Sequence, residues 1–183
     1  MTTREQKAQA GHYEILGETL AKFEFFEAGW NPYQRYLDVD KVDFILRRRE
    51  ADNVVYKEVQ VKYGKLYDCG PKWEQALFDV TSWRFFRHDE FKDYAGRRDL
   101  YLAYVLAHDT GYKGDIFLFP ISTFHELLAK AHVSGEKRMV WISRSLKEPD
   151  RWYFRLKRGF EVINQDTCVE VTKYRRNFKV LEQ

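Results

Sequence analysis

The sequence predicts an α/β fold in which helices flank a mixed β-sheet, within a single domain of 183 residues. Three observations predict this class. Apolar residues recur at helical spacing close to the N-terminus, two later segments alternate apolar and polar residues as strands do, and several short apolar runs have the composition of buried strands. Because no repeat or Gly/Ser linker divides the chain, we place no domain boundary in it.

The first part of the chain is expected to form a helix followed by a β-hairpin. The helix runs from Gln6 to Ala28 and stops at Gly29, and a turn then leads to a short strand from Tyr33 to Leu37. Two longer strands, Lys41 to Arg49 and Val54 to Lys62, are joined in a hairpin. The expected apolar stripe of the helix consists of Ile15, Leu16, Leu20, Phe23 and Phe26.

The rest of the chain is expected to alternate helices and strands. A helix with a ring-rich end is expected from Pro71 to Tyr94, where Trp73, Leu77 and Val80 have helical spacing. Pro120 opens a further helix, to about Ala131, because proline suits a helix start, where its missing N–H is not needed. The remaining strands are expected at Asp99 to Ala107, Asp115 to Phe119, Lys137 to Ser143 and Arg151 to Arg158.

The composition is that of a globular protein. Hydrophobic residues make up 44% of the chain and charged residues 32%, which excludes a disordered chain. The longest apolar run, Leu100 to Ala107, is too short to span a bilayer. Cys69 and Cys168 match no metal-binding or disulfide spacing, as is typical of a reduced compartment. We therefore expect a soluble, cytoplasmic protein without a membrane partner.

Positive charge is concentrated near the C-terminus. The net charge of the whole chain is only +3, but the residues from Arg144 onward carry a surplus of four positive charges, so we expect a basic C-terminal extension from about residue 144. Within it, Arg151, Tyr153, Arg155 and Lys157 would alternate outward on a strand. Basic residues interleaved with an aromatic ring suit phosphates and stacked bases. The alternative is an ordinary solvated face.

Several familiar sites are absent from the sequence. No phosphate-binding loop, nucleophile elbow or dinucleotide fingerprint occurs, and the five histidines never fall at zinc spacing. The predicted hairpin is different, because Asp43 shares a sheet face with Gln60 and Lys62, and with Glu58 two residues further back. Carboxylate and amide oxygens suit Mg²⁺, and a nearby lysine suits phosphoryl chemistry. The alternative is the solvent-exposed face of an amphipathic hairpin.

The segment from Gly17 to Lys62 resembles the core of the PD-(D/E)xK phosphodiesterase superfamily, the restriction-endonuclease-like nucleases. In that pattern a helix carries a glutamate and ends at a Gly-aromatic pair, a strand bears an aspartate, and the next strand carries acid-x-Lys. Here Glu18 precedes Gly29-Trp30, and Asp43 lies in the predicted strand from Lys41 to Arg49. Gln60-Val61-Lys62 fills the last motif. The resemblance implies a restriction-endonuclease-like core.

The resemblance also implies an activity. A metal-dependent endonuclease, acting on DNA, would bind Mg²⁺ or Mn²⁺ through Asp43, Gln60 and Glu18, and Lys62 would position or activate the attacking water. Gln60 replaces the acid of the motif, as in the active Q-x-K nucleases that the segment resembles. Glu58 and Glu14 are the secondary candidates. The family often acts as a homodimer or beside a partner subunit.

Three other functions are compatible with the sequence. A catalytically inactive nucleic-acid-binding module of the same fold would keep the basic C-terminal residues without binding a metal. An RNA-directed enzyme would use the same site. An interaction protein would use the unusually high aromatic content, 17% of the chain, to bind another protein.

Overall fold

The computed structural model describes residues 4–34 and 42–182, and over these residues the expected mixed α/β architecture is confirmed. The α-helices are α1 (Arg4–Glu27), α2 (Lys72–Gln75) and α3 (Ile121–Lys130). The strands are β1 (Asn31–Gln34), β2 (Phe44–Glu50), β3 (Asn53–Asp68), β4 (Phe78–Arg87), β5 (Leu100–His108), β6 (Gly111–Pro120), β7 (His132–Ser134), β8 (Lys137–Ser145), β9 (Trp152–Arg155) and β10 (Cys168–Glu170). Three short 3-10 helices are η1 (Lys92–Tyr94), η2 (Thr172–Tyr174) and η3 (Phe178–Glu182).

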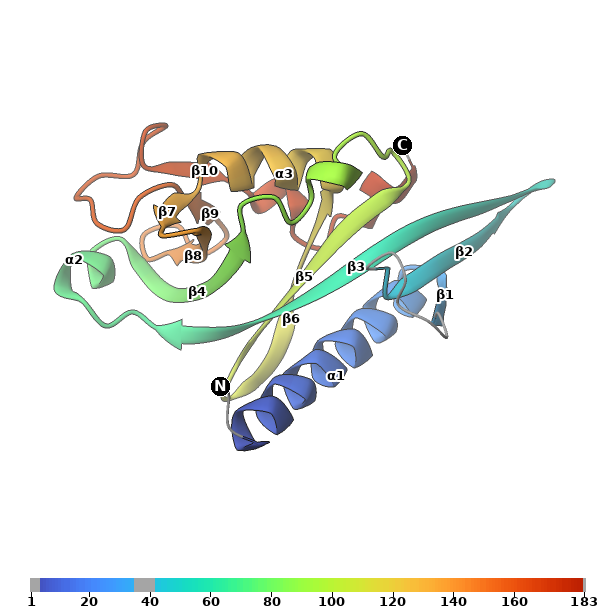
Figure 1. Ribbon diagram of the computed structural model, residues 1–183, viewed down its shortest axis with the longest axis horizontal. Coiled ribbons are helices and arrows are strands. Elements are labelled where there is room, and N and C mark those ends of the chain that lie inside the picture. The colour runs from blue at the N-terminus through green and yellow to red at the C-terminus, as the bar shows by residue number, and fades with distance from the viewer. Residues whose placement is uncertain (1–3, 35–41, 183) are drawn as a thin grey trace.

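The 16-residue strand β3 is the centre of the largely antiparallel sheet (Figure 1). Its first part pairs antiparallel with β2, which in turn pairs with β1. Strand β3 also pairs with β5, in parallel, and its last residues pair antiparallel with β4. On its other edge β4 pairs with β8, which pairs with β9, and β9 pairs with β10. Strand β3 therefore links two parts of one sheet. The segment from β2 to β3 is the predicted hairpin.

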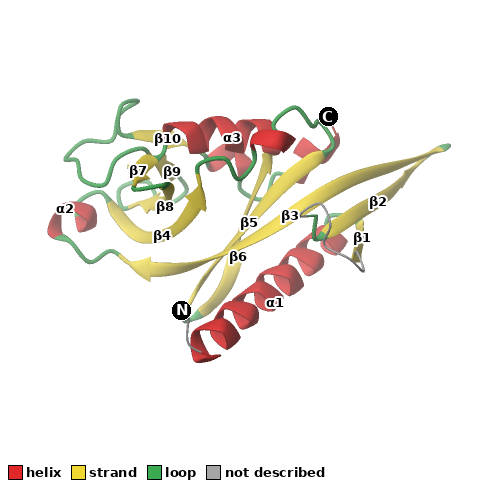
Figure 2. Ribbon diagram, in the orientation of Figure 1, coloured by secondary structure: helices red, strands yellow, loops and turns green. Residues whose placement is uncertain are grey.

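Helix α1 covers one face of the first part of the sheet (Figures 1 and 2). Phe44, Val59 and Val61 form a core there with Phe25 of the helix. The helix approaches closely at Gly17, where an added Cβ would lie 2.9 Å from the Cβ of Tyr63. The expected apolar stripe is only partly correct, because the residues at its far edge, Ile15, Phe23 and Phe26, are exposed.

The second core fills the space between the opposite face of β5 and β6 and the part of the sheet formed by β4, β8 and β9. Helix α3 closes this core with Phe124, which packs against Phe86 and Phe119 at ring distances of 5.3 and 5.5 Å. The helix begins directly after Pro120, as predicted. None of the helices in the described part of the chain is long and apolar enough to cross a membrane.

The predicted helix from Pro71 to Tyr94 is wrong apart from the single turn of α2 and the short η1. The longest element of the segment is strand β4, which pairs with β8 from Phe78 to Arg87 with one irregularity between Phe78 and Val80. Its rings favour strands, and pairing with a strand distant in sequence outweighed the local helical spacing. One further strand is shorter than predicted, because β9 ends at Arg155. Residues 35–37 of the predicted first strand, and Lys41 at the start of the next, lie outside the described residues.

Candidate active site

Strand β3 changes its partner between residues 60 and 65, and we call this segment with the side chains around it the strand junction. Pairing with β2 ends where Phe44 faces Val59, and pairing with β4 begins only at Leu66. Between these points two side chains form hydrogen bonds with backbone groups of β3. The N–H of Val61 donates to Oδ2 of Asp43 at 2.5 Å, and Nη1 of Arg84 donates to the carbonyl oxygen of Tyr63 at 2.9 Å.

The structure brings Asp43, Gln60 and Lys62 together at the strand junction. Val59 and Val61 face the α1 core, so the alternation of β3 turns Gln60 and Lys62 to the opposite face. Gln60 is only 5% exposed, and the Lys62 side chain is 18% exposed. Asp43 lies directly before β2, and its carboxylate accepts the hydrogen bond from the N–H of Val61 that the carbonyl of a neighbouring strand would otherwise accept. Its negative charge also acts to raise the pKa of Lys62.

Lys62 is a largely buried cation among charged side chains. Burial lowers the pKa of its ammonium group, and Arg84 lowers this pKa further, whereas the carboxylates of Glu90, Asp43 and Glu14 act to raise it. Nζ of Lys62 lies 3.9 Å from Oε1 of Glu90. The other Glu90 oxygen, Oε2, accepts from the backbone N–H at residue 87, which holds the carboxylate in place.

A pocket of about 340 Å³ adjoins the strand junction. Tyr13 lines it from α1, with its ring stacked on that of Tyr63 at 5.2 Å. Tyr67 and Trp83 line the side towards the end of β3. Cationic and anionic groups border this one hollow, and its charged lining residues are Glu14, Lys62, Lys65 and Arg84.

Two of the predicted carboxylates have other partners. Glu18 accepts from Nε2 of Gln34 at 3.4 Å, on the side of α1 that faces β1. Glu58 forms an ion pair with Arg97 at 3.0 Å. Glu14, a secondary candidate, is the α1 carboxylate whose charge acts on Lys62.

Sequence reasoning missed Glu90. It lies in the turn after β4, inside the segment predicted as a helix, and reaches Lys62 through the tertiary fold. No local sequence pattern singles out this residue, since its neighbours in the chain are also charged.

The strand junction carries oxygen donors of the two kinds, carboxylate and amide, that a magnesium ion takes from proteins. Mg²⁺ typically binds one or two protein carboxylates and completes its octahedron with water and phosphate oxygens. Asp43, directly before β2, supplies the carboxylate that is bonded to the N–H of Val61, and Gln60, the residue before Val61 on β3, is buried and supplies the amide. Within residues 4–34 and 42–182 no group of three or more His, Cys, Asp or Glu side chains is placed to hold a metal ion.

The expected outward row in the basic extension is wrong for two of its four residues. Tyr153 is 8% exposed and Arg155 only 1%, so neither reaches a phosphate. Both faces of β9 are buried, because Trp73 of α2 and Phe160 of the following loop cover the face that was expected to be free. The outer two, Arg151 and Lys157, are exposed, with Arg151 beside the carboxylates of Glu148 and Glu170 at 3.3 and 3.9 Å.

Comparison of the chain with known proteins finds no relative. No protein-family model matches the chain, and no curated protein or solved structure matches it significantly. The functional interpretation therefore depends on the residues of the strand junction.

Proposed function

We propose that the protein is a metal-dependent nuclease that hydrolyses phosphodiester bonds in DNA at the strand junction. The observation that carries the proposal is that Asp43 accepts a hydrogen bond from the β3 backbone at Val61, between Gln60 and Lys62, beside a charged pocket. The chain order of helix α1, which carries Glu18, Asp43 directly before β2, and Gln60 and Lys62 on β3 supports the proposal, because it is the order of the pattern that the sequence resembles.

The side-chain oxygens of Asp43 and Gln60 would hold the metal ion. When bound, Mg²⁺ or Mn²⁺ would supply an activated water and neutralise charge on the phosphate. The hydrogen bond from the N–H of Val61 to Oδ2 holds the Asp43 carboxylate against β3, at the residue between Gln60 and Lys62 in the chain. Glu18 of α1 is proposed to act from a greater distance, through water.

Lys62 would orient the attacking water and stabilise the charge that develops on the phosphoryl oxygens. In the reaction, the water oxygen bonds to phosphorus and loses a proton to the solvent, the bond to the leaving sugar oxygen breaks, and that oxygen takes up a proton from the solvent. Partial burial strengthens the field of the ammonium group at the phosphate, because little water surrounds it. Arg84 and Lys65, which line the same pocket, would attract the backbone of the substrate.

A catalytically inactive nucleic-acid-binding module is the second candidate. It is favoured by the amide at position 60 and by the lack of a three-carboxylate cluster in the described residues. Such a module would bind DNA through Arg84 and Lys65 in the same pocket but leave it uncut.

Replacing Gln60 by glutamate is expected to raise the affinity for Mg²⁺, because a second carboxylate joins Asp43 at the metal. Calorimetric titration of Mg²⁺ and Mn²⁺ into the wild type and Gln60→Glu measures this. In parallel, both proteins are incubated with supercoiled plasmid and with labelled single strands of DNA and RNA. We expect the wild type to cut DNA with either metal and to be inactive in EDTA.

Each part of this experiment can contradict the proposal separately. Identical titration heats for the two proteins would show that position 60 does not touch a metal. A wild type that binds DNA in Ca²⁺ but cuts no substrate with any metal would establish the inactive binding module instead. Glu27→Gln on the exposed end of α1 is the matched control for a change of one charge.

A further inference from the structure

A second pocket, of about 460 Å³, lies on the outer face of β4 and β8 and is rich in aromatic rings. Trp83 and Phe85 stand two residues apart on β4, with ring centroids 5.9 Å apart in an edge-to-face arrangement. They are 46% and 40% exposed, and Tyr67, at the end of β3, is 40% exposed. Flat, exposed rings around a hollow of this size are suited to a planar ligand.

The inner wall of this aromatic pocket is rigid. The guanidinium of Arg155 lies 4.9 Å from the rings of both Trp73 and Trp141, and it pairs with the buried carboxylate of Glu74. Trp141 is the cross-strand neighbour of Trp83, so the exposed ring of Trp83 lies beside a buried one. Preorganised side chains lose little conformational entropy when a ligand binds.

Polar groups in the aromatic pocket provide more than a stacking surface. Arg155 is 1% exposed and lines the pocket, and its Nε has no hydrogen-bond partner among the described residues. Thr81 adds a hydroxyl group, bonded to Ser143 at 2.8 Å. A buried donor without a partner is costly, and a ligand with acceptors on the edge of a flat ring would satisfy it. Nucleobases have such edges.

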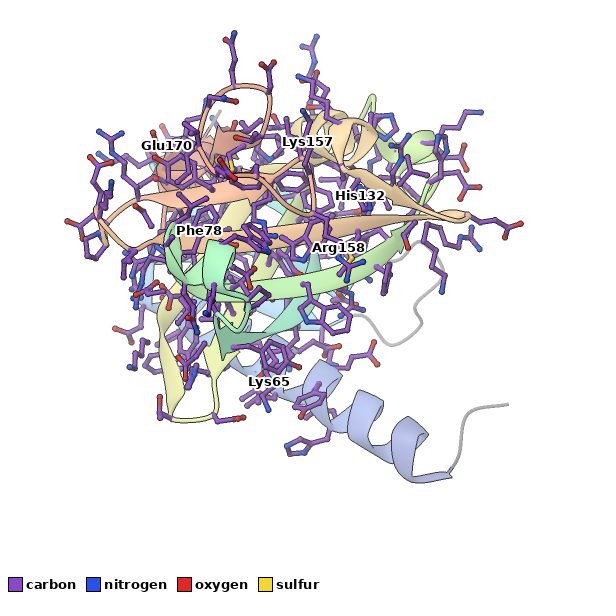
Figure 3. All side chains as sticks on the ribbon, turned by 90° about the vertical axis from the view of Figure 1, so that its left-hand side faces the viewer. Lys65, Phe78, His132, Lys157, Arg158 and Glu170 are labelled. Carbon is purple, nitrogen blue, oxygen red and sulfur yellow. The ribbon has the colours of Figure 1, made fainter. Side chains whose placement is uncertain are left out.

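The aromatic pocket adjoins the pocket at the strand junction, because Tyr67 and Trp83 line both. Figure 3 looks onto this end of the molecule and labels Arg158, a residue of the aromatic pocket, above Lys65, a residue of the strand junction. Arg158 is exposed and adds a positive charge at the rim. A strand whose phosphate lies at the strand junction therefore has an aromatic hollow beside it.

We propose that the aromatic pocket receives an unpaired base of the nucleic-acid strand that is bound at the strand junction. The proposal rests on the proposed function for its substrate class and adds that the substrate is single-stranded, or unpaired, next to the cleaved bond. Trp83 and Phe85 stack on the base, the buried Arg155 and Thr81 form the inner wall behind its edge, and Arg158 contacts the adjoining phosphate.

The test measures binding of a fluorescein-labelled single-stranded DNA dodecamer by anisotropy, in Ca²⁺ so that binding is separated from cleavage. Phe85→Ala and Trp83→Ala are each expected to weaken binding about 5- to 150-fold, the range for losing one base stack. Phe26→Ala, which removes an exposed ring from α1, is the matched control and should bind as the wild type does. Circular dichroism confirms that each variant is folded.

A second oligonucleotide separates the base from the backbone. A dodecamer of abasic residues keeps every phosphate, so we expect the wild type and Phe85→Ala to bind it equally weakly. The proposal is overturned if Phe85→Ala and Trp83→Ala bind the normal dodecamer as the wild type does, if the abasic strand binds as tightly as the normal one, or if the wild type binds neither. Failure of cleavage leaves this binding result standing, so the two proposals fail separately.

Discussion

Replacing Lys62 by alanine is expected to slow DNA cleavage by about a hundredfold or more, the usual cost of removing one preorganised electrostatic group from a transition state. The variant should remain folded, because Lys62 lies on the polar face of β3 while the apolar residues behind it form the core with α1. Binding of DNA in Ca²⁺ should weaken only modestly, since Arg84 and Lys65 still line the pocket. Single-turnover cleavage rates in Mg²⁺ measure the effect.

The matched control for Lys62→Ala is Lys57→Ala. Lys57 lies on the same strand but on the opposite face, with its ammonium group 5.5 Å from the ring of Tyr101. This variant should cut DNA at the wild-type rate. If Lys62→Ala cut as fast as Lys57→Ala, the catalytic site would have to lie elsewhere in the protein.

Replacing Glu74 by alanine is expected to lower the free energy of unfolding by about 3–5 kcal/mol, the usual cost of breaking a buried ion pair. The side chains of Glu74 and Arg155 are only 8% and 1% exposed, and burial lowers the pKa of Arg155 in spite of the neighbouring carboxylate. Without Glu74 the guanidinium is left buried without its counter-ion. Urea denaturation followed by tryptophan fluorescence measures the loss.

Two further variants make the stability prediction specific. Glu148→Ala removes a carboxylate from the exposed pair with Arg151, and its urea midpoint should stay close to that of the wild type. The double variant Glu74→Leu, Arg155→Met replaces both buried charges by apolar groups and should recover most of the lost stability. A midpoint for Glu74→Ala equal to that of Glu148→Ala would show that the buried pair contributes nothing.

The parts of the fold that follow from local patterns could be predicted from the sequence. Helix α1, the β2–β3 hairpin, β5, β6 and α3 all have periodicities or stop signals that operate over a few residues. The hairpin alternation also placed Gln60 and Lys62 on one face of β3, which is where the structure has them.

The parts that depend on distant contacts could not be predicted in this way. β4 forms because β8, more than fifty residues later in the chain, pairs with it, and this pairing places Glu90 near Lys62. Arg155 was expected outside because strands often alternate between core and solvent. The structure buries it, since α2 and the loop after β9 cover the second face.

If Asp43 binds the catalytic metal ion, replacing it by asparagine should abolish cleavage in Mg²⁺. An asparagine oxygen can still accept the hydrogen bond from Val61 that Asp43 accepts now, so the variant should keep the fold and lose only the charge. Cleavage of end-labelled DNA in Mg²⁺ is compared for the wild type and Asp43→Asn, with thermal melting of both proteins as the check on folding. We predict that the wild type cuts and Asp43→Asn does not, with partial recovery in excess Mn²⁺. A folded Asp43→Asn that cuts at the wild-type rate in Mg²⁺ would contradict the account.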